Sequence, residues 1–156
     1  MRNQKGFSLI ELLLVVAVIL IISAIAIPSF LRSRMRANEA NTVASLRVIV
    51  TAAVTYSTNY PNLGYPAQLT FLGGANPCTP VPSQACLVDD SLAQGLKDGY
   101  KFQLTGDGLT PPYSFTVSAT PQAVGSSGQN MFCMDQTAVV HYDPTGAGCS
   151  SASPTL

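Results

Sequence analysis

An apolar run near the amino terminus limits what this chain can fold into more than any other stretch. Between Phe7 and Leu31 the run contains one ionisable side chain, that of Glu11. About 24 residues at about 1.5 Å each form a helix of about 36 Å, longer than the hydrocarbon core of about 30 Å in a bilayer. The run therefore predicts a membrane-spanning helix. Glu11 is a candidate functional residue, because an ionisable group at lipid depth needs a partner.

The residues before the run do not follow the order of a secretory signal. Residues 1–6 carry two basic side chains, Arg2 and Lys5. A secretory signal also starts with basic residues, but its apolar part is shorter and a small residue follows it at the cleavage site. In this chain the small residue, Gly6, precedes the apolar run. A cut after Gly6 would remove the charges and keep the hydrophobic helix.

This arrangement resembles the amino terminus of the type IV pilin family, which includes the pseudopilins of type II secretion. Lys5 and Gly6 end the leader, Phe7 follows as the first mature residue, and Glu11 and Pro28 lie in the apolar run. The resemblance covers about the first third of the chain and is architectural beyond it. It implies that a membrane-embedded prepilin peptidase cuts between Gly6 and Phe7 and methylates the new amine of Phe7.

The resemblance also implies a role for Glu11 in assembly, in which its carboxylate meets the Phe7 amine of a neighbouring subunit. The charges agree with this role, because a carboxylate and an ammonium offset part of each other's desolvation in an apolar bundle. Two plainer interpretations remain open. Glu11 can be a helix-start carboxylate favoured by the helix dipole, and the run can be an ordinary membrane anchor.

Pro28 lies late in the apolar run and is a third candidate for a role in assembly. Its ring removes one helical hydrogen bond. We expect the helix to be continuous or gently bent at Pro28 in the isolated subunit. In a filament we expect a locally unwound stretch just before Pro28, because neighbouring helices would tolerate an extension there.

The helix is predicted to continue beyond the apolar run, to about Asn59. Apolar side chains recur at steps of three and four residues, at Val43, Leu46, Val50, Ala53 and Val54. This spacing indicates an amphipathic helix with one buried stripe. Pro61 then ends the helix, because the residue before a proline is disfavoured in the α-helical region.

Three arginines, Arg32, Arg34 and Arg36, follow the apolar run directly. The plain interpretation is that they snorkel at a membrane boundary. The alternative is that they pair with acidic groups of neighbouring subunits in a filament. The chain as a whole contains 8 basic and 8 acidic residues, so no surface for a polyanion such as nucleic acid is expected.

Four cysteines lie in the part of the chain that the anchor would place outside the cytoplasm: Cys78, Cys86, Cys133 and Cys149. An even number in such a compartment predicts two disulfides. Short separations favour Cys78–Cys86 and Cys133–Cys149 over the two other connectivities. A metal site is the weaker alternative, because the sequence contains no CxxC pair and one histidine, His141.

Residues 61–99 form a long connection rich in Pro, Gly, Ser and Asn. Asp89 and Asp90 precede Leu92 and Leu96 there, which predicts a short capped helix that extends toward Gly99. Asp89 and Asp90 could also bind calcium, as in some pseudopilins, but a role in capping the helix is favoured.

The remainder is predicted to form an antiparallel sheet. Alternating or apolar segments occur at residues 100–104, 113–119, 131–134 and 138–142, separated by turn signals. Tyr113 begins the apolar face of the second segment. Four short strands would put one apolar face over the stripe of the helix. The fold class is therefore α+β, with a long amino-terminal helix on a small sheet.

The predicted organisation is a cleaved leader at 1–6, a transmembrane and filament-core helix at 7–31, an amphipathic half at 32–60 and a globular head at 61–156. Within the head, 61–99 is a loop with a stapled segment and 100–145 is the sheet. Residues 146–156 form a carboxy-terminal loop and tail, which is expected to be mobile beyond Cys149.

The resemblance implies a structural subunit that polymerises into an extracellular type IV pilus. Its partners would be further copies of itself, the prepilin peptidase, the pilus assembly machinery and, before assembly, the inner membrane. No catalytic constellation or cofactor motif supports an enzyme. The alternatives are a pseudopilin of type II secretion, which more often lacks the second disulfide, and a monomeric membrane-anchored binding domain, which would not need Glu11.

Overall fold

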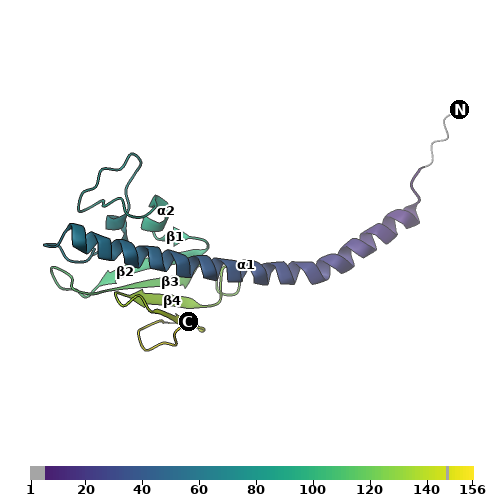
Figure 1. Ribbon diagram of the computed structural model, residues 1–156. Helices are drawn as coiled ribbons and strands as arrows, with labels where there is room; N and C mark the ends of the chain where they lie inside the picture. Colours follow the sequence, from purple (N-terminus) through teal and green to yellow (C-terminus); the bar gives the residue numbers. More distant parts are fainter. Residues whose placement is uncertain (1–5, 147) are drawn as a thin grey trace. The chain divides into compact units, whose positions relative to one another are not determined.

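The computed structural model describes residues 6–146 and 148–156. The chain divides into two compact units, and the boundary between them falls between Arg34 and Met35. Helix α1 (Leu9–Asn59) contributes to both units (Figure 1). Residues 1–5 of the predicted leader lie outside the described residues.

In the first unit, α1 exposes apolar side chains around its whole circumference. Every residue from 9 to 34 is exposed except Ser23, which is half-buried. The helix is long and apolar enough to cross a membrane. It remains helical through Pro28, as expected for the isolated chain.

In the second unit, α1 buries one stripe of side chains: Thr42, Ser45, Leu46, Ile49, Val50, Ala52, Ala53 and Tyr56. The steps of three and four residues confirm the predicted amphipathic half. The prediction is wrong for Val54, which is 42% exposed. Val54 follows Ala53 by one residue and therefore lies about 100° away from it around the helix.

The sheet has five antiparallel strands in sequential order: β1 (Leu96–Lys97), β2 (Tyr100–Gly106), β3 (Phe115–Pro121), β4 (Met131–Asp135) and β5 (Val140–Asp143). In the second unit, α1 runs along one face of this sheet (Figure 1). Alternate side chains of β2 and β3 are buried on that face, because successive residues of a strand point to opposite sides. The α+β fold predicted from the sequence is confirmed.

One hydrophobic core joins α1 to the sheet. Leu46 and Ile49 of α1 and Val117 of β3 have no exposed surface and belong to the same cluster. Burying a side chain of this size stabilises the fold by about 1.5–3 kcal/mol. The head is therefore held to the second half of α1 by the hydrophobic effect.

Polar side chains at the beginning of this half also hold the loop between β3 and β4. The Asn38 amide donates to the Ser127 carbonyl at 2.8 Å. Glu39 Oε1 accepts from the backbone N–H groups of Gln129 at 2.8 Å and Asn130 at 3.0 Å. These bonds satisfy loop groups that the strands cannot pair, so the loop is fixed against α1.

The strand β1 was not predicted, because its two residues were assigned to a helix extending toward Gly99. Helix α2 (Asp90–Ala93) is shorter than that. Gly95 follows it with a φ of +79°, and its carbonyl accepts from the Phe102 N–H at 2.8 Å. A positive φ is readily adopted by glycine, so the chain turns at Gly95. Leu96 then enters the sheet edge and is 53% exposed.

Residues 61–99 also contain η1 (Leu69–Leu72), a short 3-10 helix that buries Leu69 and Leu72. The Leu72 carbonyl accepts from the N–H groups of Leu87 and Val88 at 2.7 and 3.1 Å. The long connection is therefore packed onto the core by its own backbone hydrogen bonds.

Tyr113 was predicted to begin a strand on the apolar face, which is wrong. It precedes β3 and is 71% exposed. The carboxylate of Asp107 accepts from the N–H groups of Tyr113 and Ser114, at 2.9 Å each. These hydrogen bonds hold the chain in a loop up to Ser114, and strand pairing starts at Phe115.

The expectation of a mobile tail beyond Cys149 is also wrong. The Pro154 carbonyl accepts from the Tyr142 N–H at 2.9 Å, and the Leu156 N–H donates to the Val140 carbonyl at 3.1 Å. Thr155 thereby lies beside β5 in a short antiparallel bridge. The composition of the tail is typical of a flexible segment, but β5 has an edge whose backbone groups need partners.

The structure contains the two predicted disulfides, Cys78–Cys86 and Cys133–Cys149. The first closes a loop of the long connection, with a sequence separation of 8 residues. The second joins β4 to the segment before the tail, with a separation of 16 residues. It therefore ties the tail to the sheet whose edge the tail covers.

The predicted cap of α2 is present. Asp89 Oδ1 accepts from the Leu92 N–H at 2.9 Å, and Asp89 Oδ2 pairs with Lys97 Nζ at 2.9 Å. The hydrogen bond from Ser91, followed by those from Lys97 and Leu92, lowers the pKa of Asp89 to about 2. A lowered pKa means that the folded state favours the ionised carboxylate.

The side chains of Ile49 and Val48 provide the first test of this fold. Ile49 has no exposed surface, whereas Val48 is 48% exposed. We expect Ile49→Ala to lower the free energy of unfolding by about 2–5 kcal/mol, because it leaves a cavity in the core. Val48→Ala is the neighbouring control and should change it by about 0.5 kcal/mol or less. Denaturant unfolding of the full chain in detergent micelles measures both, and equal losses would contradict this core.

The cap gives a prediction about pH. Because the pKa of Asp89 is lowered from 3.8 to about 2, its stabilisation is present above pH 3.8 and is lost as the pH falls through about 2. Asp89→Asn keeps a capping oxygen but removes the charge. We expect it to be less stable than wild type by about 1 kcal/mol or less near neutral pH, since the site is partly exposed.

This stability difference should disappear toward pH 2. Thermal unfolding from pH 7 to pH 2 measures it. Asp98→Asn is the control, because it removes an exposed carboxylate that makes no ion pair among the described residues. A difference for Asp89→Asn that stays constant over this range would contradict the ionic role of Asp89.

Candidate functional site

The first candidate site is the junction of Gly6 and Phe7, which precedes α1 in the sequence. The chain is not helical at residues 6–8, and Phe7 is 82% exposed. A Cβ atom added at Gly6 would meet nothing within 4 Å. Packing within this chain therefore does not require glycine at position 6, and the accessible, non-helical backbone suits a segment that another protein must recognise.

Glu11 lies in the first turn of α1, four residues beyond Phe7. Its side chain is exposed and forms no ion pair or side-chain hydrogen bond with the described residues. The backbone N–H of Glu11 donates to the Ser8 carbonyl at 3.1 Å. A carboxylate in the first turn is favoured by the helix dipole, so the plain interpretation of Glu11 fits this position as well.

The apolar side chains around Glu11 also lack partners in the described chain. Leu9, Ile10 and Leu12 are 81%, 74% and 61% exposed, and Phe30 near the end of the run is 67% exposed. Contiguous apolar surface of this extent marks contact with a membrane or with other protein surfaces. This half of α1 therefore needs a cover that the chain itself does not supply.

The arginines that follow the run, Arg32, Arg34 and Arg36, are all exposed. The one ion pair within residues 6–146 and 148–156 joins Lys97 to Asp89. The three guanidinium groups are thus free to interact outside the chain, which is compatible with both interpretations of the cluster.

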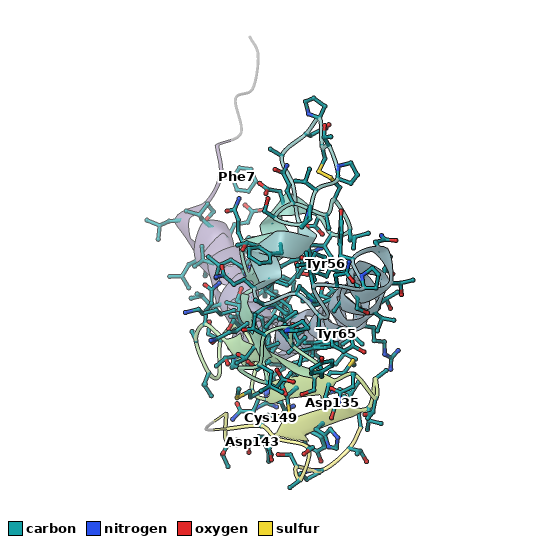
Figure 2. The ribbon with its side chains drawn as sticks, turned by 90° about the vertical axis from the view of Figure 1, so that its left-hand side faces the viewer. Phe7, Tyr56, Tyr65, Asp135, Asp143 and Cys149 are labelled. Atoms are coloured by element: carbon teal, nitrogen blue, oxygen red, sulfur yellow. A yellow bond between two sulfur atoms is a disulfide. The ribbon has the colours of Figure 1, made fainter. Side chains whose placement is uncertain are left out.

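The head contains a groove of about 410 Å³ beside the end of α1. Tyr56, Tyr65 and Phe71 contribute aromatic surface to it, and its lining has no charged side chain. In Figure 2, Asp135, Asp143 and Cys149 lie lower in the view than Tyr56 and Tyr65. The lining of the groove thus contains no carboxylate, imidazole, ammonium or thiol group.

The residues suspected of metal binding have other contacts. The described residues contain no group of three His, Cys, Asp or Glu side chains that could hold a metal ion. Asp89 caps α2, and Asp90 accepts from the Gln94 amide at 2.8 Å. His141 Nδ1 lies 2.7 Å from the Ser153 carbonyl, so its ring contacts the tail.

Two kinds of comparison relate the chain to known proteins. The family described as "Prokaryotic N-terminal methylation motif" matches residues 1–27. The chain is 59% identical over 39 residues to the type IV wide pilus major component PilA4 of Thermus thermophilus, which covers 25% of this chain and 30% of that protein. No solved structure matches the chain.

Two further relatives match a similar length. The chain is 40% identical over 54 residues to the type IV major pilin protein PilA of Myxococcus xanthus, covering 35% of this chain and 24% of that protein. It is 45% identical over 53 residues to a fimbrial protein of Pseudomonas aeruginosa, covering 34% of each chain. The matched part thus spans about a third or less of these relatives.

The matches lie where the candidate residues for processing and assembly were found. Gly6, Phe7 and Glu11 all fall within the methylation motif, whereas the groove, the disulfides and the sheet lie beyond residue 27. The amino-terminal segment therefore matches the prokaryotic N-terminal methylation motif, and the chain is similar over 39 to 54 residues to type IV pilins.

Proposed function

We propose that this chain is a structural subunit that polymerises through the apolar half of α1 into an extracellular type IV pilus. One observation carries the proposal. The apolar half of α1 is exposed on all sides, contains a single carboxylate, and lies in the segment that is similar to major pilins. A lipid bilayer can cover this surface before assembly, and copies of the same helix can cover it afterwards.

The proposal favours a pilus subunit over a secretion pseudopilin. Two of the relatives are called a type IV wide pilus major component and a type IV major pilin protein. The proposed role is structural and requires no catalytic group or cofactor. In this view the subunit resides in the inner membrane first and at the cell surface after assembly.

Processing by a prepilin peptidase is the first step of this function. The cut separates Gly6 from Phe7 and creates a cationic amine, which is then methylated. The exposed junction and the methylation motif support this step. Cleavage at this point also removes the basic residues Arg2 and Lys5.

Assembly then depends on the charge of Glu11. Left unpaired in an apolar bundle, its carboxylate would cost several kcal/mol or take up a proton. The amine at Phe7 of a neighbouring subunit supplies a partner of opposite charge, and such a buried pair fixes the axial register of packed helices, as buried polar groups do in coiled coils. Unwinding just before Pro28 in the filament stays a prediction.

Processing gives a direct test. We expect filament protein to begin at Phe7 with a methylated amine, and Gly6→Leu to leave an uncut precursor in the membrane, because a bulky side chain then occupies the cleavage position. Intact-mass spectrometry distinguishes these forms. Gly148→Leu is the matched control, because a Cβ atom at Gly148 also meets nothing within 4 Å. Filaments built from chains that begin at Met1 would contradict the proposal.

Glu11 gives the second test. We expect Glu11→Ala to be made, inserted and cleaved, but to lower the yield of sheared filaments at least about tenfold, because the partner of the buried amine is lost. Glu11→Gln should be intermediate at best, since it keeps the shape and loses the charge. Lys101→Ala is the control, because it also removes an exposed charge but lies on β2, outside the apolar half of α1.

The assay separates sheared filaments from the membrane fraction and measures the subunit in each. Electron microscopy of the sheared material identifies the filaments. Wild-type yield from Glu11→Ala would leave Glu11 as a helix-start carboxylate and would favour the interpretation of the run as an anchor for a monomeric domain.

A further inference from the structure

One face of the second half of α1 is largely uncovered in the described chain, although Arg47 and Thr51 share a surface depression with Leu87 at its edge. Arg36, Ala40, Arg47 and Thr51 are exposed on it, whereas Leu46 and Ile49 point into the core. Arg36 and Arg47 are 11 residues apart, so they lie about 20° apart around the helix and about 16 Å apart along it. In Figure 1 no strand or helix covers the side of α1 that faces away from the sheet.

This face, defined by Arg36 and Arg47, carries positive charge that the head does not neutralise. Neither guanidinium group forms an ion pair or hydrogen bond with the described residues. The acidic residue of this half of α1 is Glu39, and its Oε1 already accepts from Gln129 and Asn130. The arginine face therefore has two guanidinium groups and no counter-charge of its own.

A surface of opposite charge lies at α2 and β1, which we call the acidic patch and define by Asp89, Asp90, Lys97 and Asp98. Lys97 pairs with Asp89 at 2.9 Å. Asp90 and Asp98 are exposed and have no ion pair among the described residues. The patch therefore keeps two carboxylates that are not paired with a cation.

The acidic patch borders a different side of α1 from the arginine face. Asp89 and Asp98 share a shallow surface depression with Asn41, Ala44 and Val48 of α1. Those three helix residues lie roughly 60–140° around α1 from Arg36 and Arg47 at about 100° per residue. The arginine face and the acidic patch of one molecule therefore lie on different sides of α1.

We propose that the arginine face of one copy binds the acidic patch of a second copy of this chain. The proposal rests on the proposed filament function and names a contact between heads within the filament. Two unpaired guanidinium groups face two unpaired carboxylates, so the charges complement each other. The contact joins two different surfaces of identical chains, and a heterologous contact of this kind repeats into an open helical array.

The contact between the arginine face and the acidic patch determines the alignment of neighbouring heads more than it adds to the affinity between subunits. Exposed ion pairs are individually weak, and salt screens them over a Debye length of about 10 Å at 0.1 M. The apolar halves of α1 have the larger surface to bury. Complementary charges exclude wrong alignments of the heads, because a shifted copy would bring like charges together.

The test is a charge swap in the full chain, measured as the yield of sheared filaments. One variant carries Arg36→Glu and Arg47→Glu. A second carries Asp90→Lys and Asp98→Asn, where asparagine is chosen because Asp98 has a φ of +50°, which asparagine tolerates. A third combines all four changes. Lys101→Glu is the control, because it reverses an exposed, unpaired charge on the opposite face of the sheet.

We expect each of the first two variants to lower filament yield at least about tenfold. The combined variant should recover at least about a third of the wild-type yield, and Lys101→Glu should match wild type. Thermal unfolding of each variant in detergent checks that the head still folds. Wild-type filaments in the first two variants, or no recovery in the combined variant, would overturn the proposal.

Two outcomes separate this proposal from the proposed function. If wild-type protein forms no filaments, the filament function itself fails. If wild type assembles and the arginine variant alone loses filaments without recovery by the swap, the second copy is the wrong partner, and an anionic membrane surface becomes the occupant of the arginine face. Binding of each variant to vesicles containing an anionic phospholipid then measures that interaction.

Discussion

The structure depends on one helix, α1, whose two halves differ in how far their apolar side chains are buried. The second half of α1 buries Leu46, Ile49 and Ala53 under the sheet, whereas the first half buries no apolar side chain within the chain. Apolar surface in water is unfavourable by about 25 cal/mol for each Å². The first half therefore exposes an apolar surface that the described chain does not cover, whereas the second half and the sheet cover each other.

The charged residues of the head divide into two groups by their partners. Glu39, Asp89 and Asp107 accept hydrogen bonds from backbone N–H groups of loops or of a helix start. Arg36 and Arg47 have no such contacts in the described chain. These three carboxylates thus shape the isolated head, whereas the guanidinium groups, like the carboxylates of Asp90 and Asp98, have no ion pair in the described chain. This division links the local fold to the proposed contact between copies.

The sequence patterns predicted the elements that depend on residues close together in the chain. They failed for elements whose formation depends on pairing with residues far away in the sequence. Gly6, Glu11 and Pro28 were singled out as candidate residues because their positions relative to the apolar run could be read directly from the sequence. The strand β1 and the paired tail were missed, since Leu96 and Thr155 become strand residues through partners elsewhere in the chain. The arginine face needed the structure too, because the sequence does not show that the loops of the head leave the guanidinium groups of Arg36 and Arg47 without an ion pair in the described chain.

The two proposed contacts between copies differ in their surroundings, and this difference gives them different tasks. A pair between Glu11 and the amine of Phe7 lies among apolar side chains, where salt screens charges little and a missing partner is costly. A contact between the arginine face and the acidic patch lies at the surface, where each ion pair is weak and readily screened. The first therefore decides whether a subunit can enter the filament. The second decides how the heads align, and a reversed charge there opposes assembly because it brings like charges together.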